Sequence, residues 1–140
     1  MATGGAEVEG VDLVPAFIEH ARAHFPGVPF RVGSLRNLEV PDGRLAGILS
    51  WYSLIHLPPA DVPGVLQEFA RALAPGGGLL LAFFESAERT RFPHAVTDAY
   101  SWPVDDFSGL LEAAGFSVVE THTRTDAGHR PHAAIVARKD

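Results

Sequence analysis

The chain has 140 residues and a formal net charge of −6, with 46% hydrophobic and 20% charged residues, which is ordinary composition for one globular domain over residues 1–140. No cluster of Lys or Arg interleaves with aromatic residues, so nucleic-acid binding is not indicated. Cysteine is absent, which excludes disulfides and cysteine-based metal or catalytic sites. Neither a signal peptide nor a membrane-spanning apolar run is visible, and we expect a cytoplasmic protein with no membrane association.

The N-terminal part of the sequence predicts a strand, a helix and a second strand. The first strand is expected over Glu7–Val11, and the helix over Pro15–His24, where proline takes the tolerated first position. The second strand is expected over Val28–Val32. Leu35–Arg44 contains turn-forming residues and is expected to be a loop.

The middle of the chain predicts a strand, a helix and another strand. The apolar run Leu45–Trp51 is typical of a strand covered on both faces. A helix is expected from Asp61, as its N-cap, to about Leu73, because apolar residues recur there at helical spacing. Pro75-Gly76-Gly77 is expected to end that helix, and Gly78–Phe84 to form a buried strand.

The C-terminal part predicts a long irregular connection, a helix and a hairpin. Glu85–Trp102 shows no clear period, and a helix follows over Asp105–Ala114, with Gly115 as its left-handed cap. The strands Phe116–Thr123 and Ala133–Arg138 are joined by a segment too short for a helical crossover, so they are expected to form an antiparallel hairpin.

This order of elements indicates an α/β fold with a doubly wound, mostly parallel sheet and a C-terminal antiparallel hairpin. Ligands of such sheets bind beyond the carboxyl ends of the strands, so polar residues at those ends are the candidates for a site. Asp12 follows the first strand, where its carboxylate could hold ribose hydroxyls or could cap the next helix. Gly33-Ser34-Leu35 follows the second strand and could approach a flat ring, although a plain turn explains it more simply.

Aromatic and histidine side chains follow the third strand and fill the long connection. Ser50, Trp51, Tyr52 and His56 come at or after the end of Leu45–Trp51, which favours a site over simple completion of the core. The long connection carries three candidates for contact with a substrate, which could equally pack a lid onto the sheet: His94, Tyr100 and Trp102.

No metal site is expected from the sequence. His20 and His24 are four residues apart on a helix, but no nearby acid completes a zinc-binding pattern, and a solvated helix face explains them better.

Taken together, the segments resemble the class I S-adenosylmethionine-dependent methyltransferases over nearly the whole chain. The resemblance implies a Rossmann-like methyltransferase fold, with S-adenosylmethionine as cofactor. It is carried by four stretches in the family's order: "VEGVDLVPAFIEHAR", "FRVGSLRNLEVPDGRLAGILSWYSLIHL", "LQEFARALAPGGGLLLAFF" and "LLEAAGFSVVETHT".

The resemblance also implies roles for particular residues. Asp12 matches the acid that holds the ribose hydroxyls, and Ser34 stands where the family often carries an Asp beside the adenine. A serine hydroxyl can still pair with an amine, with less charge assistance. The residues implied to bind cofactor are Asp12, Leu13, Ser34, Leu35, Ser50, Trp51 and Tyr52.

The family's first strand, glycine-rich loop and first helix should precede Val8, and they are not in this sequence. The expected fold is therefore truncated at its N-terminus. Because unpaired buried backbone groups cost about 1–3 kcal/mol each, the sheet is expected to close the gap, to recruit a strand by homo-oligomerisation, or to fold poorly.

The function expected from the resemblance is methyl transfer from S-adenosylmethionine to a small-molecule nucleophile, largely by positioning of the two reactants. His56 is the first candidate for a general base where one is needed, and His94 the next. Two alternatives remain open. The chain could be a non-catalytic remnant or a sheet-completing subunit, or a fragment of an NAD-binding dehydrogenase, against which the closing hairpin argues.

Overall fold

The structure is a computed structural model that describes residues 8–12, 15–94 and 97–140. The chain divides into two compact units, Met1–Glu39 and Val40–Asp140, and each is described by itself. No helix within the described residues is long and apolar enough to cross a bilayer.

The first unit contains a helix and two short parallel strands. They are β1 (Gly10–Asp12), α1 (Pro15–His24) and β2 (Phe30–Val32), with Gly10 opposite Phe30 and Asp12 opposite Val32. The bounds predicted for the helix are confirmed, whereas the second strand is shorter than predicted. The Phe30 ring lies where a side chain at position 10 would stand, so this pairing depends on Gly10.

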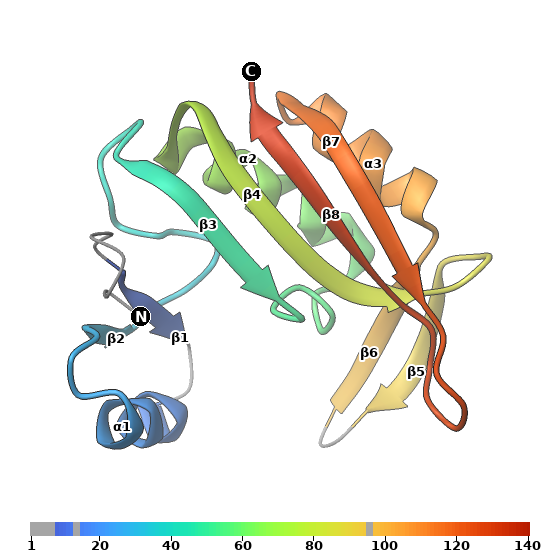
Figure 1. The fold of residues 1–140 in the computed structure, drawn as a ribbon, viewed down its shortest axis with the longest axis horizontal. Helices are drawn as coiled ribbons and strands as arrows, with labels where there is room; N and C mark the ends of the chain where they lie inside the picture. The colour runs from blue at the N-terminus through green and yellow to red at the C-terminus, as the bar shows by residue number, and fades with distance from the viewer. Residues whose placement is uncertain (1–7, 13–14, 95–96) are drawn as a thin grey trace. The chain divides into compact units, whose positions relative to one another are not determined.

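The second unit is a mixed six-stranded sheet with helices on one face. Its strands are β3 (Leu45–Trp51), β4 (Leu73–Glu85), β5 (Thr90–His94), β6 (Thr97–Trp102), β7 (Phe116–Arg124) and β8 (His132–Lys139). β4 lies between β3, which is parallel to it, and β8, which is antiparallel, and β7 pairs with the far edge of β8 (Figure 1). The predicted C-terminal hairpin is confirmed.

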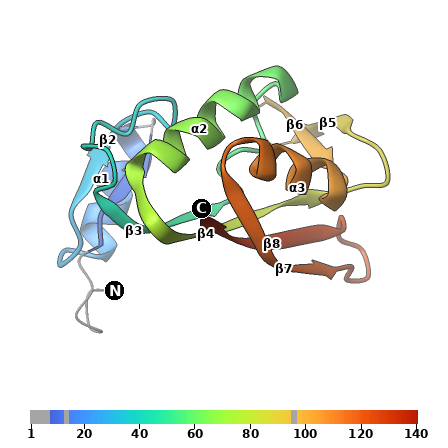
Figure 2. The same cartoon turned by 90° about the horizontal axis from the view of Figure 1, so that it is seen from above.

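Two helices cover the same face of this sheet (Figure 2). They are α2 (Val62–Ala72), which follows the 3-10 turn η2 (Pro59–Asp61), and α3 (Val104–Ala113). The apolar stripe of α2 is buried as predicted, and Phe107 of α3 stacks on Phe83 of β4 with ring centroids 4.7 Å apart. The helix-facing side of the sheet adds further buried side chains to this core: Leu79, Leu81, Ala133, Ile135 and Ala137.

The prediction of an irregular segment over Glu85–Trp102 was wrong, because β5 and β6 form an antiparallel hairpin there. β6 also pairs in parallel with the end of β4, through Phe84 and Ser101. Pro93 and several charged residues obscured the strand pattern. β5 is an edge strand, and an edge strand tolerates a proline because one side of its backbone needs no partner.

The predicted start of α2 is confirmed, because the helix begins directly after Asp61, whereas the predicted start of β4 was wrong. At the N-cap position the Asp61 side chain makes no capping hydrogen bond and the backbone is helical (φ −91°, ψ −16°), because Asp61 ends the 3-10 turn that leads into the helix. β4 begins at Leu73 and not at Gly78, since Leu73 already pairs with Leu45. A register shift then absorbs the intervening residues, and the left-handed Gly76 (φ +78°) lies among them.

Candidate functional site

In the first unit, Asp12 is the last residue of β1, at the carboxyl end where ligands of such sheets bind. Its side chain is half-buried, and its carbonyl oxygen accepts a hydrogen bond of 2.9 Å from the Gly33 amide. A side chain at position 33 would come within 3.0 Å of Val11 and Arg31, so glycine allows the two strand ends to approach. The backbone thus fixes the position from which the Asp12 carboxylate projects.

Ser34 forms part of a tight turn after β2. Its Oγ accepts a hydrogen bond of 3.1 Å from the Arg36 amide, and it forms an isolated bridge with Asn37. The segment therefore forms a turn, and its contact with a ring stays a prediction, for which the Ser34 hydroxyl could donate a hydrogen bond. Leu35 is half-buried in the same turn, and Leu13 lies outside the described residues.

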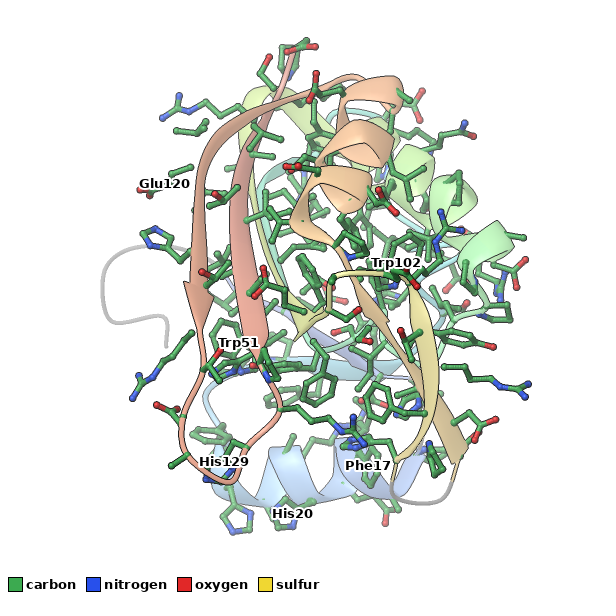
Figure 3. The ribbon with its side chains drawn as sticks, turned by 90° about the vertical axis from the view of Figure 1, so that its right-hand side faces the viewer. Phe17, His20, Trp51, Trp102, Glu120 and His129 are labelled. Atoms are coloured by element: carbon green, nitrogen blue, oxygen red, sulfur yellow. The ribbon has the colours of Figure 1, made fainter. Side chains whose placement is uncertain are left out.

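In the second unit, three predicted site residues follow one another at the carboxyl end of β3. Ser50 is 2% exposed, and its Oγ has no hydrogen-bond partner among the described residues. Trp51 (labelled in Figure 3) is 58% exposed. Its ring meets the Tyr52 ring edge to face, with the ring centroids 5.5 Å apart. A buried hydroxyl without a partner beside an exposed indole is unusual for a packed core, because buried polar groups are normally hydrogen-bonded.

Tyr52 is held in an uncommon conformation. Its φ is +57°, a left-handed value that is rare for a bulky residue, and its amide donates to the Ala82 carbonyl at 2.9 Å. Its hydroxyl is 2.6 Å from Nδ1 of His132, the first residue of β8. Burial raises the pKa of the Tyr52 phenol above its ordinary value. Such backbone outliers cluster at functional sites, which makes this turn a candidate site on independent grounds.

His56 and His94, the predicted candidates for a base, lie side by side. Their ring centroids are 5.6 Å apart. His56 Nδ1 is 2.8 Å from the Asp98 carbonyl oxygen, which can only accept, so Nδ1 carries the hydrogen and Nε2 keeps its lone pair. The His94 ring packs against Phe84 at 5.4 Å and Phe92 at 6.0 Å.

The two remaining candidates lie on β6. The amide of Tyr100 donates to the Ile55 carbonyl at 2.7 Å and ties β6 to the segment that contains His56, while the Tyr100 residue is half-buried. Trp102 (labelled in Figure 3) is 1% exposed. Its ring packs against Phe107 with centroids 5.0 Å apart, and the Arg89 guanidinium lies 4.7 Å from the ring centroid. Trp102 thus contributes to the core, while its buried Nε1 has no hydrogen-bond partner among the described residues, so contact with a substrate stays a prediction.

Sequence reasoning missed His132. It follows the short polar segment Asp126–Pro131, and the sequence indicates the flank of a turn, but the register of β8 places it opposite Phe84, next to the end of β4. Within the described ranges, no group of three or more His, Cys, Asp or Glu could hold a metal ion.

Comparison with known proteins identifies the class. The family model of the methyltransferase domain matches residues 1–77. A probable S-adenosylmethionine-dependent methyltransferase of Mycolicibacterium smegmatis is 31% identical over 120 residues, which are 81% of this chain and 45% of that protein. The chain thus spans about half the length of this relative.

Solved structures agree with this family. A methyltransferase from Methanosarcina mazei superposes with a TM-score of 0.84 at 18% identity, covering 99% of this chain and 84% of that one. The 1,6-didemethyltoxoflavin-N1-methyltransferase of Burkholderia thailandensis, with bound 1,6-didemethyltoxoflavin and S-adenosylhomocysteine, superposes with a TM-score of 0.81 at 25% identity, covering 96% of this chain and 62% of that one.

The chain therefore belongs to the methyltransferase domain family, and its fold is the Rossmann-like fold of class I S-adenosylmethionine-dependent methyltransferases. The family expected from the sequence is confirmed.

Proposed function

We propose that this protein binds S-adenosylmethionine and transfers its methyl group to a small-molecule acceptor. The observation that carries the proposal is the match of residues 1–77 to the methyltransferase domain family. The candidate residues at the carboxyl ends of β1 and β3 agree with it, because this is where doubly wound sheets bind their ligands.

The residues present fit this cofactor. The Asp12 carboxylate can accept two hydrogen bonds from ribose hydroxyls, and the turn of Ser34 and Leu35 offers a hydroxyl donor and an apolar side chain to an adenine ring. The buried Ser50 Oγ lacks a partner among the described residues, as expected of a group that binds a ligand. When bound, S-adenosylmethionine supplies a methyl group activated by its positively charged sulfur.

A small acceptor is supported by charge and by similarity. The net charge of −6 and the absence of a basic patch give no support to a nucleic-acid acceptor. The similar Burkholderia thailandensis enzyme is named for a small acceptor, 1,6-didemethyltoxoflavin. The rings of Phe84 and Phe92 pack against His94, and Tyr52 packs against Phe84, so this group offers flat apolar surfaces of the kind that line small-molecule sites.

For acceptors that must lose a proton, His56 is the first proposed base. Its Nε2 keeps a lone pair because Nδ1 donates to Asp98. Loss of a general base typically costs about 10²–10⁴-fold in rate, so we expect His56→Ala to lose turnover on that scale while retaining cofactor affinity. His122→Ala is the matched control, since His122 is exposed on β7.

The test is methyl transfer from radiolabelled S-adenosylmethionine to a panel of 1,6-didemethyltoxoflavin, a catechol, a primary amine and a thiol. Label in any product, with release of S-adenosylhomocysteine, supports the proposal. A folded protein that binds neither S-adenosylmethionine nor S-adenosylhomocysteine overturns it. Binding of NAD in preference to S-adenosylhomocysteine would favour the dehydrogenase alternative instead.

A second candidate function, association through the sheet, is favoured by β3. Among the described residues, β3 is hydrogen-bonded to β4 on one edge and to no strand on the other. Leu49 and Trp51 on this strand are exposed large apolar side chains. We propose that this edge pairs with a strand of a second copy, as exposed apolar edges tend to do. A monomer by light scattering that stays monomeric at high concentration would exclude it.

A further inference from the structure

We propose that Tyr52 and His132 form a proton-accepting pair for the methyl acceptor, with Asp126 as its electrostatic partner. This rests on the proposed function and narrows it: the acceptor is a small molecule whose nucleophilic oxygen or nitrogen carries a hydrogen that must leave. It assigns that proton to Tyr52 in place of His56, so a loss of turnover in His56→Ala together with full turnover in Tyr52→Phe would overturn the pair in favour of His56. Neither the family match nor the sequence pattern assigns a role to His132.

The pair is held rigidly at the carboxyl ends of β3 and β4. His132 stands in the ladder of β8, opposite Phe84 on one side and Arg124 on the other, so both neighbouring strands fix its backbone. Tyr52 is fixed by its amide hydrogen bond and by its left-handed backbone. Its ring also packs against Phe84 at 5.2 Å and the His132 ring at 6.4 Å. Functional groups held this closely are preorganised for one geometry.

The hydrogen bond of 2.6 Å between Tyr52 Oη and His132 Nδ1 implies a direction. His132 Nε2 is buried with no hydrogen-bond partner among the described residues, and the nearest carboxylate oxygen, Oδ2 of Asp126, is 3.9 Å from it. A negative oxygen favours a hydrogen on Nε2 over a lone pair. Nδ1 therefore accepts, and the Tyr52 hydroxyl donates.

This arrangement leaves the lone pairs of the phenol oxygen free to receive a proton. As the acceptor attacks the methyl group, its O–H or N–H proton passes to Tyr52 Oη, and the phenol proton passes to His132 Nδ1. The electron pair of the broken O–H or N–H bond stays on the acceptor atom, whose lone pair bonds the methyl carbon. The donor's sulfur keeps the electrons of the broken S–C bond, and His132 ends as an imidazolium.

Two features of the pair suit such a relay. The Asp126 carboxylate stabilises the positive charge of the imidazolium. Its Oδ1 also accepts a hydrogen bond of 3.0 Å from Arg124 Nε, so the negative charge of Asp126 is shared between Arg124 and His132. Burial raises the pKa of the Tyr52 phenol, so phenolate does not accumulate and the proton moves on to His132. Tyr52 is thus the catalytic residue that touches the acceptor, and His132 and Asp126 are positioning residues.

The first test measures the protonation of His132 directly and does not require an active enzyme. Nitrogen-15 spectra of the histidines should show His132 in the Nε2–H form, with an Nδ1 resonance displaced by an accepted hydrogen bond. Tyr52→Phe should move that resonance to the position of a free Nδ1, while His122→Gln should leave it unchanged. An Nδ1–H form of His132, or no response to Tyr52→Phe in a folded variant, would overturn the pair.

The second test measures kinetics with whichever panel acceptor is methylated. Tyr52→Phe and His132→Asn should each lower kcat by about 10²–10⁴-fold, the usual contribution of acid–base catalysis, with little change in KM. Asp126→Asn should lower kcat less, and the double variant of Tyr52 and His132 should be no slower than the worse single variant. Affinity for S-adenosylhomocysteine should be unchanged in His132→Asn and Asp126→Asn, because neither residue is among those implied to bind the cofactor.

The affinity measurement separates the two proposals. Intact S-adenosylhomocysteine binding with kcat unaffected by Tyr52→Phe would overturn the pair and leave the methyltransferase proposal standing. If the protein bound S-adenosylhomocysteine but methylated only the thiol of the panel, and no acceptor with an O–H or N–H group, the proposed class of acceptor would be wrong. Failure of the wild-type chain to bind S-adenosylhomocysteine would overturn the proposed function, and with it the role of this pair.

Discussion

The two units differ in how they combine packing with chemistry. The first has two three-residue strands and one helix, and among its described residues only Ile18 and Leu38 are buried apolar side chains. The second has a six-stranded sheet whose helix-covered face is closely packed. Asp12, the residue proposed to bind the ribose hydroxyls, nevertheless lies in the first unit. Tyr52 and His132, the pair proposed to accept a proton, lie in the second. The weakly packed unit thus carries the residue proposed to bind ribose, and the closely packed unit carries the residues proposed to accept the proton.

Truncating one phenylalanine in each unit tests the difference in packing between the two units most directly. Phe69 of α2 is 1% exposed, and we expect Phe69→Ala to lower the free energy of unfolding by about 3–5 kcal/mol, because it removes an aromatic side chain from the core and leaves a cavity. Phe17→Ala on α1 should have little effect, since Phe17 is 61% exposed. Denaturant titration of both variants gives the result, and equal losses would remove the distinction.

A glycine in the second unit gives the next largest effect. Gly115 ends α3 with φ +98°, so Gly115→Ala should destabilise by about 1–2 kcal/mol, the cost of a left-handed backbone for a residue with a Cβ. Gly27 in the first unit has open space around it and no such φ, so Gly27→Ala is the matched control. If the thermal midpoints of Gly115→Ala and Gly27→Ala agreed within the error of measurement, the turn at position 115 would not require glycine.

Ser50 allows stability to be separated from binding. Its buried hydroxyl has no partner among the described residues, so we expect Ser50→Ala to leave stability unchanged or higher. Affinity for S-adenosylhomocysteine should fall by about 0.5–1.5 kcal/mol, the net value of one hydrogen bond. Calorimetric titration measures this, with the exposed Ser53→Ala as control. If Ser50→Ala were less stable and kept full affinity, the hydroxyl would stabilise the fold and would not bind the cofactor.

The smallest effect concerns alkaline pH. Burial raises the pKa of Tyr52 above its ordinary value of 10.0, so the folded state favours the neutral phenol. Its contribution to stability is full below the unfolded pKa and is lost as pH rises through the higher folded pKa. In Tyr100→Phe, where Tyr52 is the remaining tyrosine, phenolate absorbance should appear with a midpoint above 10.0. A midpoint at or below that value would contradict the burial of Tyr52.

Local patterns explain what the sequence predicted well. α1 begins at Pro15 and β3 is a continuous apolar run, and both have the predicted bounds. The hairpin of β5 and β6 escaped prediction because Pro93 and the charged residues around it hide the alternation of its few buried side chains. Its pairing with the end of β4 is a long-range contact that no local signal encodes.

The site shows the same limit. Asp12, Tyr52 and His56 could be proposed from their place after strands, because position along the chain determines which end of a strand they follow. The partnership of Tyr52 with His132, 80 residues away, depends on the antiparallel register of β8 against β4. That register is set by packing of the whole sheet, so the sequence could supply both residues but not their contact.

Calorimetric titration of this chain with S-adenosylhomocysteine tests the central claim most directly, with Asp12→Asn beside it and the exposed Glu19→Gln on α1 as control. The account predicts saturable binding that Glu19→Gln retains. Asp12→Asn should weaken it by about 1.5–3 kcal/mol, the value of hydrogen bonds to a charged group. Absence of binding in a folded chain, or full affinity in Asp12→Asn, would contradict the assignment of a cofactor site to this chain.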